Sequence, residues 1–173
     1  MRRFALFVAL IIAPFSTTHC AECDDDPAAV NALKAIHAEL KFDKDGSVIS
    51  VNVSERDDID DDVLRHLSGL PKLKRFHAIY TKITGSGLKH LTNAKHLEVL
   101  DLYSCPITDD GLRHVRNLRQ LRRVNLIGSK LTDKSINLLT NWKKLEYLAV
   151  GESQISPEGI HKLQTALPDC EVE

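Results

Sequence analysis

The sequence predicts an α/β solenoid, a stack of similar turns that each contain one short strand and one helix. The main observation is a 24-residue repeat, whose copies begin at Leu73, Leu97, Leu121 and Leu145. In the first half of each copy hydrophobic residues alternate, as at Leu100 and Leu102, which is typical of a strand. In the second half they are spaced by three and four, which indicates a loop followed by a helix.

Each copy follows the pattern L-x-x-L-x-L-x-x-(T/C/S)-x-(I/L). Its inward polar column places Cys105 between Thr81 and Ser129, so we expect a small buried side chain there rather than a reactive thiol. Trp142 shares a hydrophobic column with Leu118, which predicts a core position. An earlier and weaker copy, 25 residues long, contains Val48, Val51, Val53 and Ile59, so the chain has about five turns.

The helix of each turn has its own start signal. Thr108 precedes Asp109 and Asp110, where a side-chain oxygen caps a helix and acidic residues favour its N-terminus. The equivalent capping residues are Asp60, Thr84, Thr132 and Ser156. A further column contains Gly87, Gly111 and Gly159. This glycine column predicts close backbone packing between turns.

The ends of the stack need covers, because a solenoid exposes its core there. Residues 22–47 predict an N-terminal cap, with a helix over Pro27–Leu40, Asp26 as its N-cap, and a hairpin around Asp45–Gly46. The repeat domain follows over residues 48–173. Its last segment, LQTALPDCEVE, predicts a half-turn that closes with a short edge strand, where Cys170 covers the last core layer.

Residues 1–21 predict a secretory signal peptide. Two arginines precede the uncharged segment FALFVALIIAPF, which is too short to span a membrane comfortably. We expect cleavage after residue 20 or 21 and a secreted or periplasmic protein without membrane insertion. Lipid attachment at Cys20 is disfavoured because His19 stands where a small residue is needed, and an uncleaved anchor is the remaining alternative. The mature chain then keeps Cys23, Cys105 and Cys170, an odd number, and a disulfide of Cys23 stays open.

Charge and spacing argue against several kinds of function. A formal net charge of −1 argues against a general nucleic-acid binder, which carries a basic excess. The segment DKDGS has Gly46 at its fourth position, whereas a calcium loop needs glycine at the sixth. His66, His90 and His114 recur one per turn, on neighbouring helices that are too far apart to share a zinc ion. We therefore predict no metal site, no cofactor and no catalytic residue.

The segment LEVLDLYSCPITDDGLRHVRNL and its copies resemble the leucine-rich repeat family. They are most similar to the ITDxGLxxLxxL subtype, found in bacterial repeat proteins and in the cysteine-containing repeats of eukaryotic F-box adaptors. The resemblance covers residues 48–173. It implies a right-handed solenoid with parallel strands on the concave face and helices on the convex face, and it specifies no ligand.

On such a fold, the strand side chains that point out of the concave face are the candidate binding site. Ile79, Tyr103 and Ile127 form one apolar column there, which is typical of a protein-binding patch with an aromatic anchor. The alternative is that β-branched and aromatic residues simply suit strands. The candidate residues are Arg75, His77, Ile79, Asp101, Tyr103, Arg123, Asn125, Ile127 and Tyr147.

These observations favour a non-enzymatic module that binds an unidentified protein partner through its concave face. One alternative is a structural or cell-surface repeat protein without a dedicated ligand. Another, by family resemblance, is an F-box-like substrate-recognition adaptor, which conflicts with a signal peptide and lacks an F-box segment here. A triad of Ser54, His77 and Asp101 is disfavoured, because an open sheet offers no evident oxyanion donors. The sequence leaves the oligomeric state open.

Overall fold

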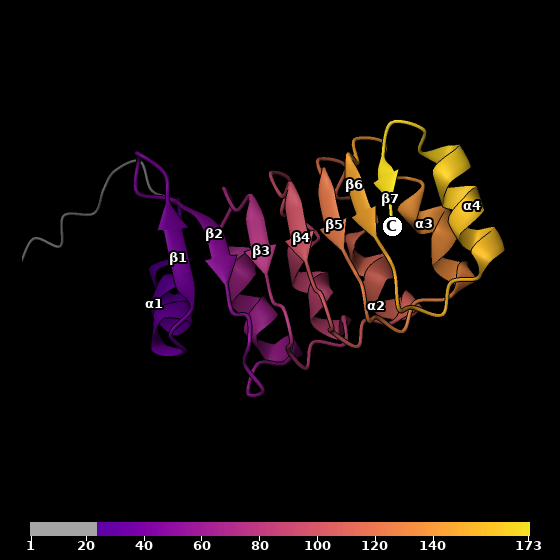
Figure 1. Ribbon diagram of the computed structural model, residues 1–173. Helices are drawn as coiled ribbons and strands as arrows, with labels where there is room; N and C mark the ends of the chain where they lie inside the picture. The colour runs from indigo at the N-terminus through magenta and orange to yellow at the C-terminus, as the bar shows by residue number, and fades with distance from the viewer. Residues whose placement is uncertain (1–23) are drawn as a thin grey trace, which may run out of the picture.

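The computed structural model describes residues 24–173, so the predicted signal peptide, Cys20 and Cys23 lie outside it. In this part of the chain one sheet contains seven strands in sequence order (Figure 1). β1 is antiparallel to β2, and each later pair is parallel, which confirms the predicted α/β repeat fold. The strands are β1 Glu39–Phe42, β2 Val48–Asn52, β3 Arg75–His77, β4 Val99–Asp101, β5 Arg123–Asn125, β6 Tyr147–Ala149 and β7 Glu171–Val172.

Helical segments return the chain along the other side of each turn (Figure 1). Many are 3₁₀ helices rather than the α-helices that the spacing predicts. A 3₁₀ helix rises about 2 Å per residue, against about 1.5 Å for an α-helix, so fewer residues span this side. In the described range no helix combines the length and hydrophobicity needed to cross a membrane. The segments are α1 Pro27–Ala35, η1 Asp61–Gly69, η2 Ser86–Leu91, α2 Asp109–Leu112, η3 Arg113–Val115, η4 Asp133–Ser135, α3 Ile136–Leu139 and α4 Pro157–Ala166.

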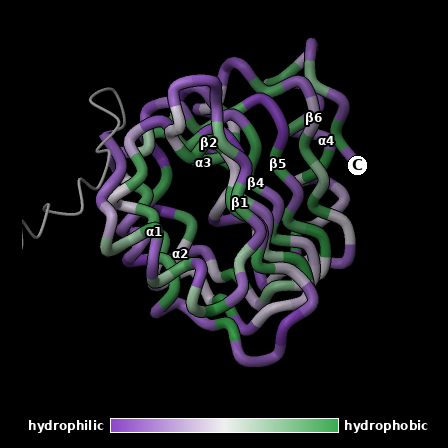
Figure 2. The backbone as a smooth tube through the Cα atoms, turned by 90° about the vertical axis from the view of Figure 1, so that its left-hand side faces the viewer, coloured by the Kyte–Doolittle hydropathy of each residue, from purple (hydrophilic) through white to green (hydrophobic). Residues whose placement is uncertain are grey.

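Hydrophobic side chains from successive turns fill the space between the sheet and the helices. Figure 2 looks along the stack and shows hydrophobic positions at corresponding places of successive turns. Phe76 and Trp142 are fully buried, which confirms the predicted core position of Trp142. Cys105 is also fully buried, and its thiol donates a 2.8 Å hydrogen bond to the Ala78 carbonyl. Burial raises the pKa of this thiol, so Cys105 has the environment of a structural residue, as predicted.

The N-terminal helix is shorter than predicted. Helix α1 ends at Ala35 and not at Leu40, because His37 adopts a left-handed conformation (φ 54°) that reverses the chain. Leu40 belongs to β1 instead. The start of the helix is as predicted, since the Asp26 carboxylate accepts a 2.9 Å hydrogen bond from the Ala28 N–H.

The predicted hairpin lies between β1 and β2, with Gly46 at a φ of 84°. The Asp43 carboxylate accepts hydrogen bonds from the N–H groups of Asp45 and Ser47, at 3.0 and 2.9 Å. These hydrogen bonds lower the pKa of Asp43, the bond from Ser47 having the largest effect. The acidic segment therefore shapes a turn.

The C-terminal cover matches the predicted half-turn. Helix α4 leads into β7, which pairs with β6 at the end of the sheet. The half-buried Cys170 packs against the hydrophobic core just before this strand. At both ends of the described chain the last core layer is thus covered by a helix and a short strand.

Four of the five predicted helix caps are confirmed. The Thr108 hydroxyl accepts a 3.2 Å hydrogen bond from the Gly111 N–H, and Asp60, Thr132 and Ser156 cap their helices in the same manner. The prediction for Thr84 is wrong. Gly85 follows it in a left-handed conformation (φ 100°) and occupies the cap position without a side-chain hydrogen bond.

Aspartates at the helix starts connect three of the turns to the next turn, a role that the sequence did not reveal. The Asp109 carboxylate accepts hydrogen bonds from the Thr132 N–H and hydroxyl, at 3.0 and 2.7 Å, and from the Ser135 hydroxyl. Asp61 binds Thr84 and the backbone of η2 in this manner, and Asp133 binds Ser156. We call these three contacts the aspartate clasps.

The glycine column packs turn against turn, as predicted. A Cβ atom at Gly111 would lie 2.7 Å from the Cα of Gly85, and one at Gly87 would lie 2.4 Å from the Asp61 carbonyl oxygen. Both contacts are with backbone, which cannot move aside as a flexible side chain does. The column therefore sets how closely these turns approach.

Gly111→Ala should destabilise the protein by about 2 kcal/mol, because the new methyl group overlaps the backbone of the preceding turn. Urea unfolding followed by circular dichroism measures this change. Gly151→Ala is the matched control, since its Cβ would have its nearest neighbour, Ile127 Cγ1, at 3.9 Å. Equal unfolding midpoints for the two variants would contradict the packing role.

Asp109→Asn should lower the free energy of unfolding at neutral pH by about 2 kcal/mol, because an amide cannot accept all the hydrogen bonds of the clasp. Burial raises the pKa of Asp109, but the hydrogen bonds from Ser135 and Thr132 outweigh it, and the net pKa is lowered. The clasp is therefore fully stabilising above the unfolded pKa of about 3.9 and is lost as the pH falls through the lower folded pKa.

Urea unfolding at a series of pH values tests this clasp. The wild type should lose stability below about pH 4 more steeply than Asp109→Asn does. Asp110→Asn is the adjacent control, because Asp110 is exposed and makes only a surface ion pair with Arg113, at 2.9 Å. If both variants follow the wild-type curve, the clasp does not stabilise the stack.

Candidate functional site

The strand pairing places the predicted concave residues in register. Arg75, Val99, Arg123 and Tyr147 are partners on adjacent strands, and so are His77, Asp101 and Asn125. The candidate residues from β3 to β6 therefore form rows across one face of the sheet.

The apolar column of this face is less exposed than the sequence predicts. Ile79, Tyr103 and Ile127 are half-buried. They follow three adjacent parallel strands, which lie about 4.8 Å apart, so each side chain shields the next. The column is a narrow apolar band and not three free side chains.

The most exposed aromatic side chain in the described range is Tyr80, at 54% exposure, and sequence analysis missed it. Its ring meets the Tyr103 ring edge-to-face, with the ring centroids 5.1 Å apart. Tyr80 directly follows Ile79 of the apolar column, and its φ of 54° turns the chain out of the strand. The same left-handed position recurs in each turn, at Glu55, Tyr80, Ser104, Gly128 and Glu152. Gly128 was the sole sequence signal for it, because glutamate, tyrosine and serine seldom adopt positive φ.

Charged groups border the band on its strand side. His77 Nδ1 lies 3.6 Å from Asp101 Oδ2, and both side chains are mostly shielded, at 29% and 22% exposure. A shallow hollow of ≈ 200 Å³ lies beside them, lined by Asp101, Asn125, Arg123, Tyr147 and neighbouring strand residues. The hollow offers a carboxylate, an amide, a guanidinium and an aromatic ring to a partner.

The C-terminal strands fix one wall of this hollow. The Arg123 guanidinium lies over the Tyr147 ring, 4.9 Å from its centroid. The Tyr147 hydroxyl donates a 2.8 Å hydrogen bond to the carboxylate of Glu173. This hydrogen bond raises the pKa of Tyr147 above its usual value. Glu173 follows the last strand and is a second residue that sequence analysis missed.

Two of the candidate residues also hold the strand ends. The Asp101 carboxylate accepts a 3.3 Å hydrogen bond from the Tyr103 N–H, and the Asn125 side chain accepts one of 3.2 Å from the Ile127 N–H. Ser54, considered above for a triad, donates its hydroxyl hydrogen to Asn52 Oδ1 at 2.6 Å. The polar groups of this face are therefore held in place by local hydrogen bonds.

The histidine column lies on the helical side of the molecule. His66 and His90 are half-buried and His114 is exposed. Within residues 24–173 no group of three or more His, Cys, Asp or Glu side chains is placed to hold a metal ion.

Comparisons with known proteins agree with this architecture. The family described as Leucine Rich repeat matches residues 93–113. No curated protein matches the chain as a whole or in part. Solved leucine-rich repeat structures match in shape, and together these findings support a leucine-rich repeat protein.

Three of these structures are bacterial or plant proteins. An internalin from Listeria monocytogenes is 18% identical over 72% of this chain and 34% of its own, with a TM-score of 0.60. A leucine-rich repeat protein of Leptospira interrogans is 25% identical over 63% and 27%, with a TM-score of 0.51. The ectodomain of the receptor kinase SOBIR1 from Arabidopsis thaliana is 19% identical over 78% and 84%, with a TM-score of 0.53. The present chain thus spans about a third or less of the two bacterial proteins.

Tyr147 should ionise above its ordinary pKa of about 10, because its hydroxyl donates to Glu173. A phenolate absorbance titration of the folded protein measures this. Glu173→Gln removes the negative charge and should shift this titration towards lower pH. Tyr147→Phe identifies which part of the absorbance change belongs to Tyr147, and an unchanged titration in Glu173→Gln would refute the pairing.

Proposed function

We propose that this leucine-rich repeat protein is an exported, non-enzymatic module that binds a protein partner through its concave strand face. The observation that carries the proposal is the aromatic pair of Tyr80 and Tyr103 at the end of the apolar band. Rigid aromatic side chains next to shielded apolar ones are the groups that dominate binding energy at protein interfaces.

The surroundings of the pair favour a protein rather than a small ligand. The Arg75 and Arg123 side chains and the pair of His77 and Asp101 provide a polar border to the apolar band. This arrangement of an apolar centre with a polar rim is typical of protein interfaces. The hollow beside it is shallow, whereas small-molecule sites are concave and enclose most of their ligand.

The solenoid lowers the cost of binding. Parallel strand pairing fixes the spacing of the rows, and local hydrogen bonds hold Asp101 and Asn125. Side chains that are already ordered lose little conformational entropy when a partner binds. The face is thus preorganised for recognition.

Structural relatives give this proposal context. The ectodomain of the receptor kinase GASSHO1/SCHENGEN3 from Arabidopsis thaliana was solved in complex with CASPARIAN STRIP INTEGRITY FACTOR 2, and it has a TM-score of 0.54 to this chain at 17% identity. It binds its partner as a leucine-rich repeat ectodomain. The shared feature is the fold, and the partner of the present chain is a matter for experiment.

A photo-crosslinking amino acid in place of Tyr80 should capture a partner from an extract of the source cells and their medium. Addition of Tyr103→Ala and Arg75→Glu should reduce that capture by about tenfold or more, because an aromatic anchor and a rim charge are lost. Quantitative mass spectrometry of the crosslinked product measures the change.

Two controls make this experiment specific. The same crosslinker in place of the exposed Lys89 on η2 should not capture the same protein. Circular dichroism should show that the double variant is folded. Equal capture from both sites, or capture that the double variant retains, would argue against a concave binding face.

A further inference from the structure

Opposite charges are segregated along the chain, although the formal net charge is only −1. Residues 24–62 contain 4 basic and 12 acidic side chains, a net charge of −8. Residues 63–145 contain 16 basic and 5 acidic side chains, a net charge of +11. Residues 146–173 contain 1 basic and 6 acidic side chains, a net charge of −5. The middle of the stack is therefore strongly basic between two acidic ends.

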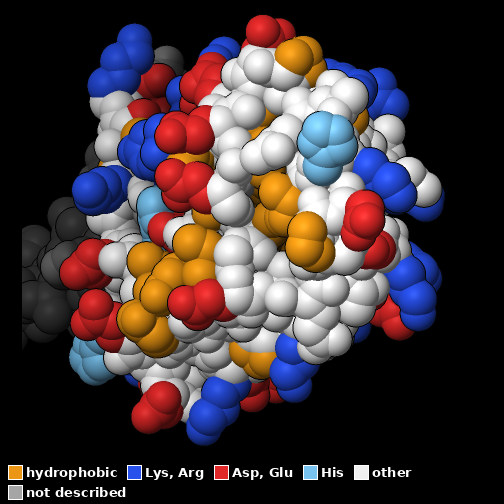
Figure 3. All heavy atoms as spheres, turned by 45° about the vertical axis from the view of Figure 1, so that its right-hand side comes forward, with side chains coloured by type: hydrophobic (Ala, Val, Ile, Leu, Met, Phe, Trp, Pro, Cys, Tyr) orange, Lys and Arg blue, Asp and Glu red, His pale blue; other side chains and the backbone are white. Residues whose placement is uncertain are grey.

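The charged side chains are distributed unevenly over the surface as well. In Figure 3, Lys and Arg side chains line much of the right-hand edge, and on the left Asp and Glu side chains are more frequent, with several Lys and Arg side chains among them. In the sequence, the stretches that lead from the helix starts of two middle turns to the next strands carry basic residues without acidic ones. Residues 111–122 and 134–145 contain no acidic residue.

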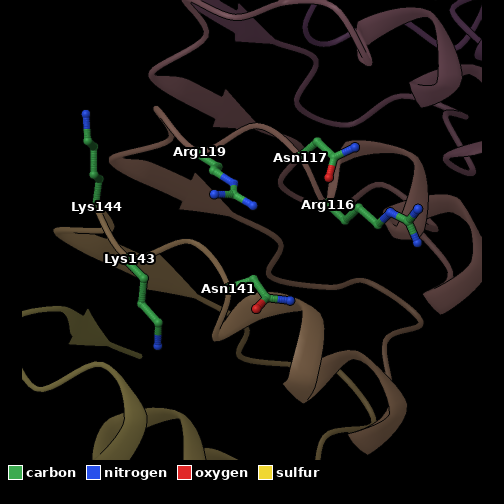
Figure 4. A pocket seen from close by; sticks show the side chains of 6 residues that line it. All are labelled: Arg116, Asn117, Arg119, Asn141, Lys143 and Lys144. Atoms are coloured by element: carbon green, nitrogen blue, oxygen red, sulfur yellow. The ribbon is translucent and has the colours of Figure 1, made fainter.

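A basic hollow lies between the turn after η3 and the turn after α3 (Figure 4). Its volume is ≈ 470 Å³. The side chains that line it come from two successive turns and are all exposed. They are Arg116, Asn117, Arg119, Asn141, Lys143 and Lys144.

The positive charges of this hollow are not neutralised by the protein. Within residues 24–173, no ion pair involves Arg116, Arg119 or Lys143. Lys144 donates a 2.7 Å hydrogen bond to the neutral side chain of Gln120. The hollow thus offers several free cationic donors within a small volume.

The residue types that line the hollow also occur at the equivalent positions of the preceding turn. Lys95, Arg119 and Lys143 occupy one column, and Asn93, Asn117 and Asn141 occupy another. Successive turns are stacked about 4.8 Å apart at the strands. A cation and an amide therefore recur side by side over three turns, which suits an extended ligand better than a single small anion.

The residue types distinguish between extended polyanions. No aromatic side chain lines the hollow, so it lacks the stacking platform that single-stranded nucleic acids use. It also lacks an apolar centre, and lysine is depleted at protein interfaces. Arginine and lysine bind the oxygen atoms of charged ester groups, and asparagine amides both donate to and accept from neutral hydroxyl groups. A polyphosphate chain has no such neutral groups.

We propose that this hollow binds a linear sulfated polysaccharide. Arg116, Arg119 and Lys143 contact its sulfate groups, and Asn117 and Asn141 contact its hydroxyl groups. The site lies at the edge where the helical segments lead back into the strands, away from the apolar band. Glycan binding at this site does not require the proposed protein partner.

Isothermal titration calorimetry of the full chain with a heparin-derived oligosaccharide tests the proposal. We expect binding that weakens as the salt concentration rises, because the contacts are exposed and ionic. Arg119→Ala combined with Lys143→Ala should weaken the affinity by about tenfold or more. Asn117→Ala should weaken it less and leave the salt dependence unchanged.

A charge-matched control separates the hollow from the overall charge. Lys82 and Lys130 are both exposed and share a column at the opposite end of the strands. Their double alanine variant therefore loses two positive charges, as Arg119→Ala with Lys143→Ala does. This control should bind like the wild type. Equal weakening in both double variants would overturn the proposal, as would no binding by the wild type at low salt.

Two further ligands decide the class of polyanion. Desulfated heparin should not bind, and polyphosphate should bind more weakly than the sulfated chain. Polyphosphate binding as tight as that of heparin would overturn the proposal in favour of unselective ionic attraction. Tyr103→Ala should leave glycan binding unchanged, so failure of this proposal is distinguishable from failure of the concave binding face.

Discussion

The contact between one turn and the next determines this structure. Each strand pairs with its predecessor in parallel, and the aspartate clasps join the helical sides of most turns. A single turn cannot bury its own hydrophobic face, so each turn is stable only when neighbouring turns or an end cap cover it. Phe76 and Trp142 are fully buried because neighbouring turns cover them.

The same contact places the two proposed binding surfaces. Since strands stack in register, residues one repeat apart form rows, and the chemistry of each row depends on a single column of the sequence. On the strand side, this produces the apolar band that ends at Tyr80 and Tyr103. On the edge where helical segments lead into strands, it produces columns of cations and amides. The scaffold is thus uniform while the two surfaces differ in chemistry.

Much of the fold could be predicted from the sequence because the repeat determines it. The strand register, the buried Cys105 and Trp142, and four helix caps all follow from periodic positions. The end of α1 could not be predicted, because it depends on the left-handed conformation of His37, a residue type that gives no such signal. Thr84 failed as a cap because the glycine after it has no fixed conformational preference.

The candidate site was less predictable than the fold. The register of the repeat identified which strand side chains face outward. It did not show how far Ile79, Tyr103 and Ile127 shield one another from solvent. Tyr80 was missed because it lies one position after the strand, where backbone conformation and not alternation decides its direction. The basic hollow was missed because only the net charge of the whole chain was considered. The acidic charge at the two ends of the chain offsets the basic charge of its middle.

Gly85 occupies the position at which Asp61, Asp109 and Asp133 stand in other turns, so one junction of the stack has no aspartate clasp. There the Thr108 N–H donates a 3.2 Å hydrogen bond to the Thr84 carbonyl, and the backbones of Gly85 and Gly111 touch. On the helical side, the two halves of the solenoid are therefore joined at this point without a carboxylate contact, whereas the strand side keeps the His77–Asp101 and Tyr80–Tyr103 contacts. We therefore expect local opening of the stack to begin at this junction, with each half keeping its own clasps.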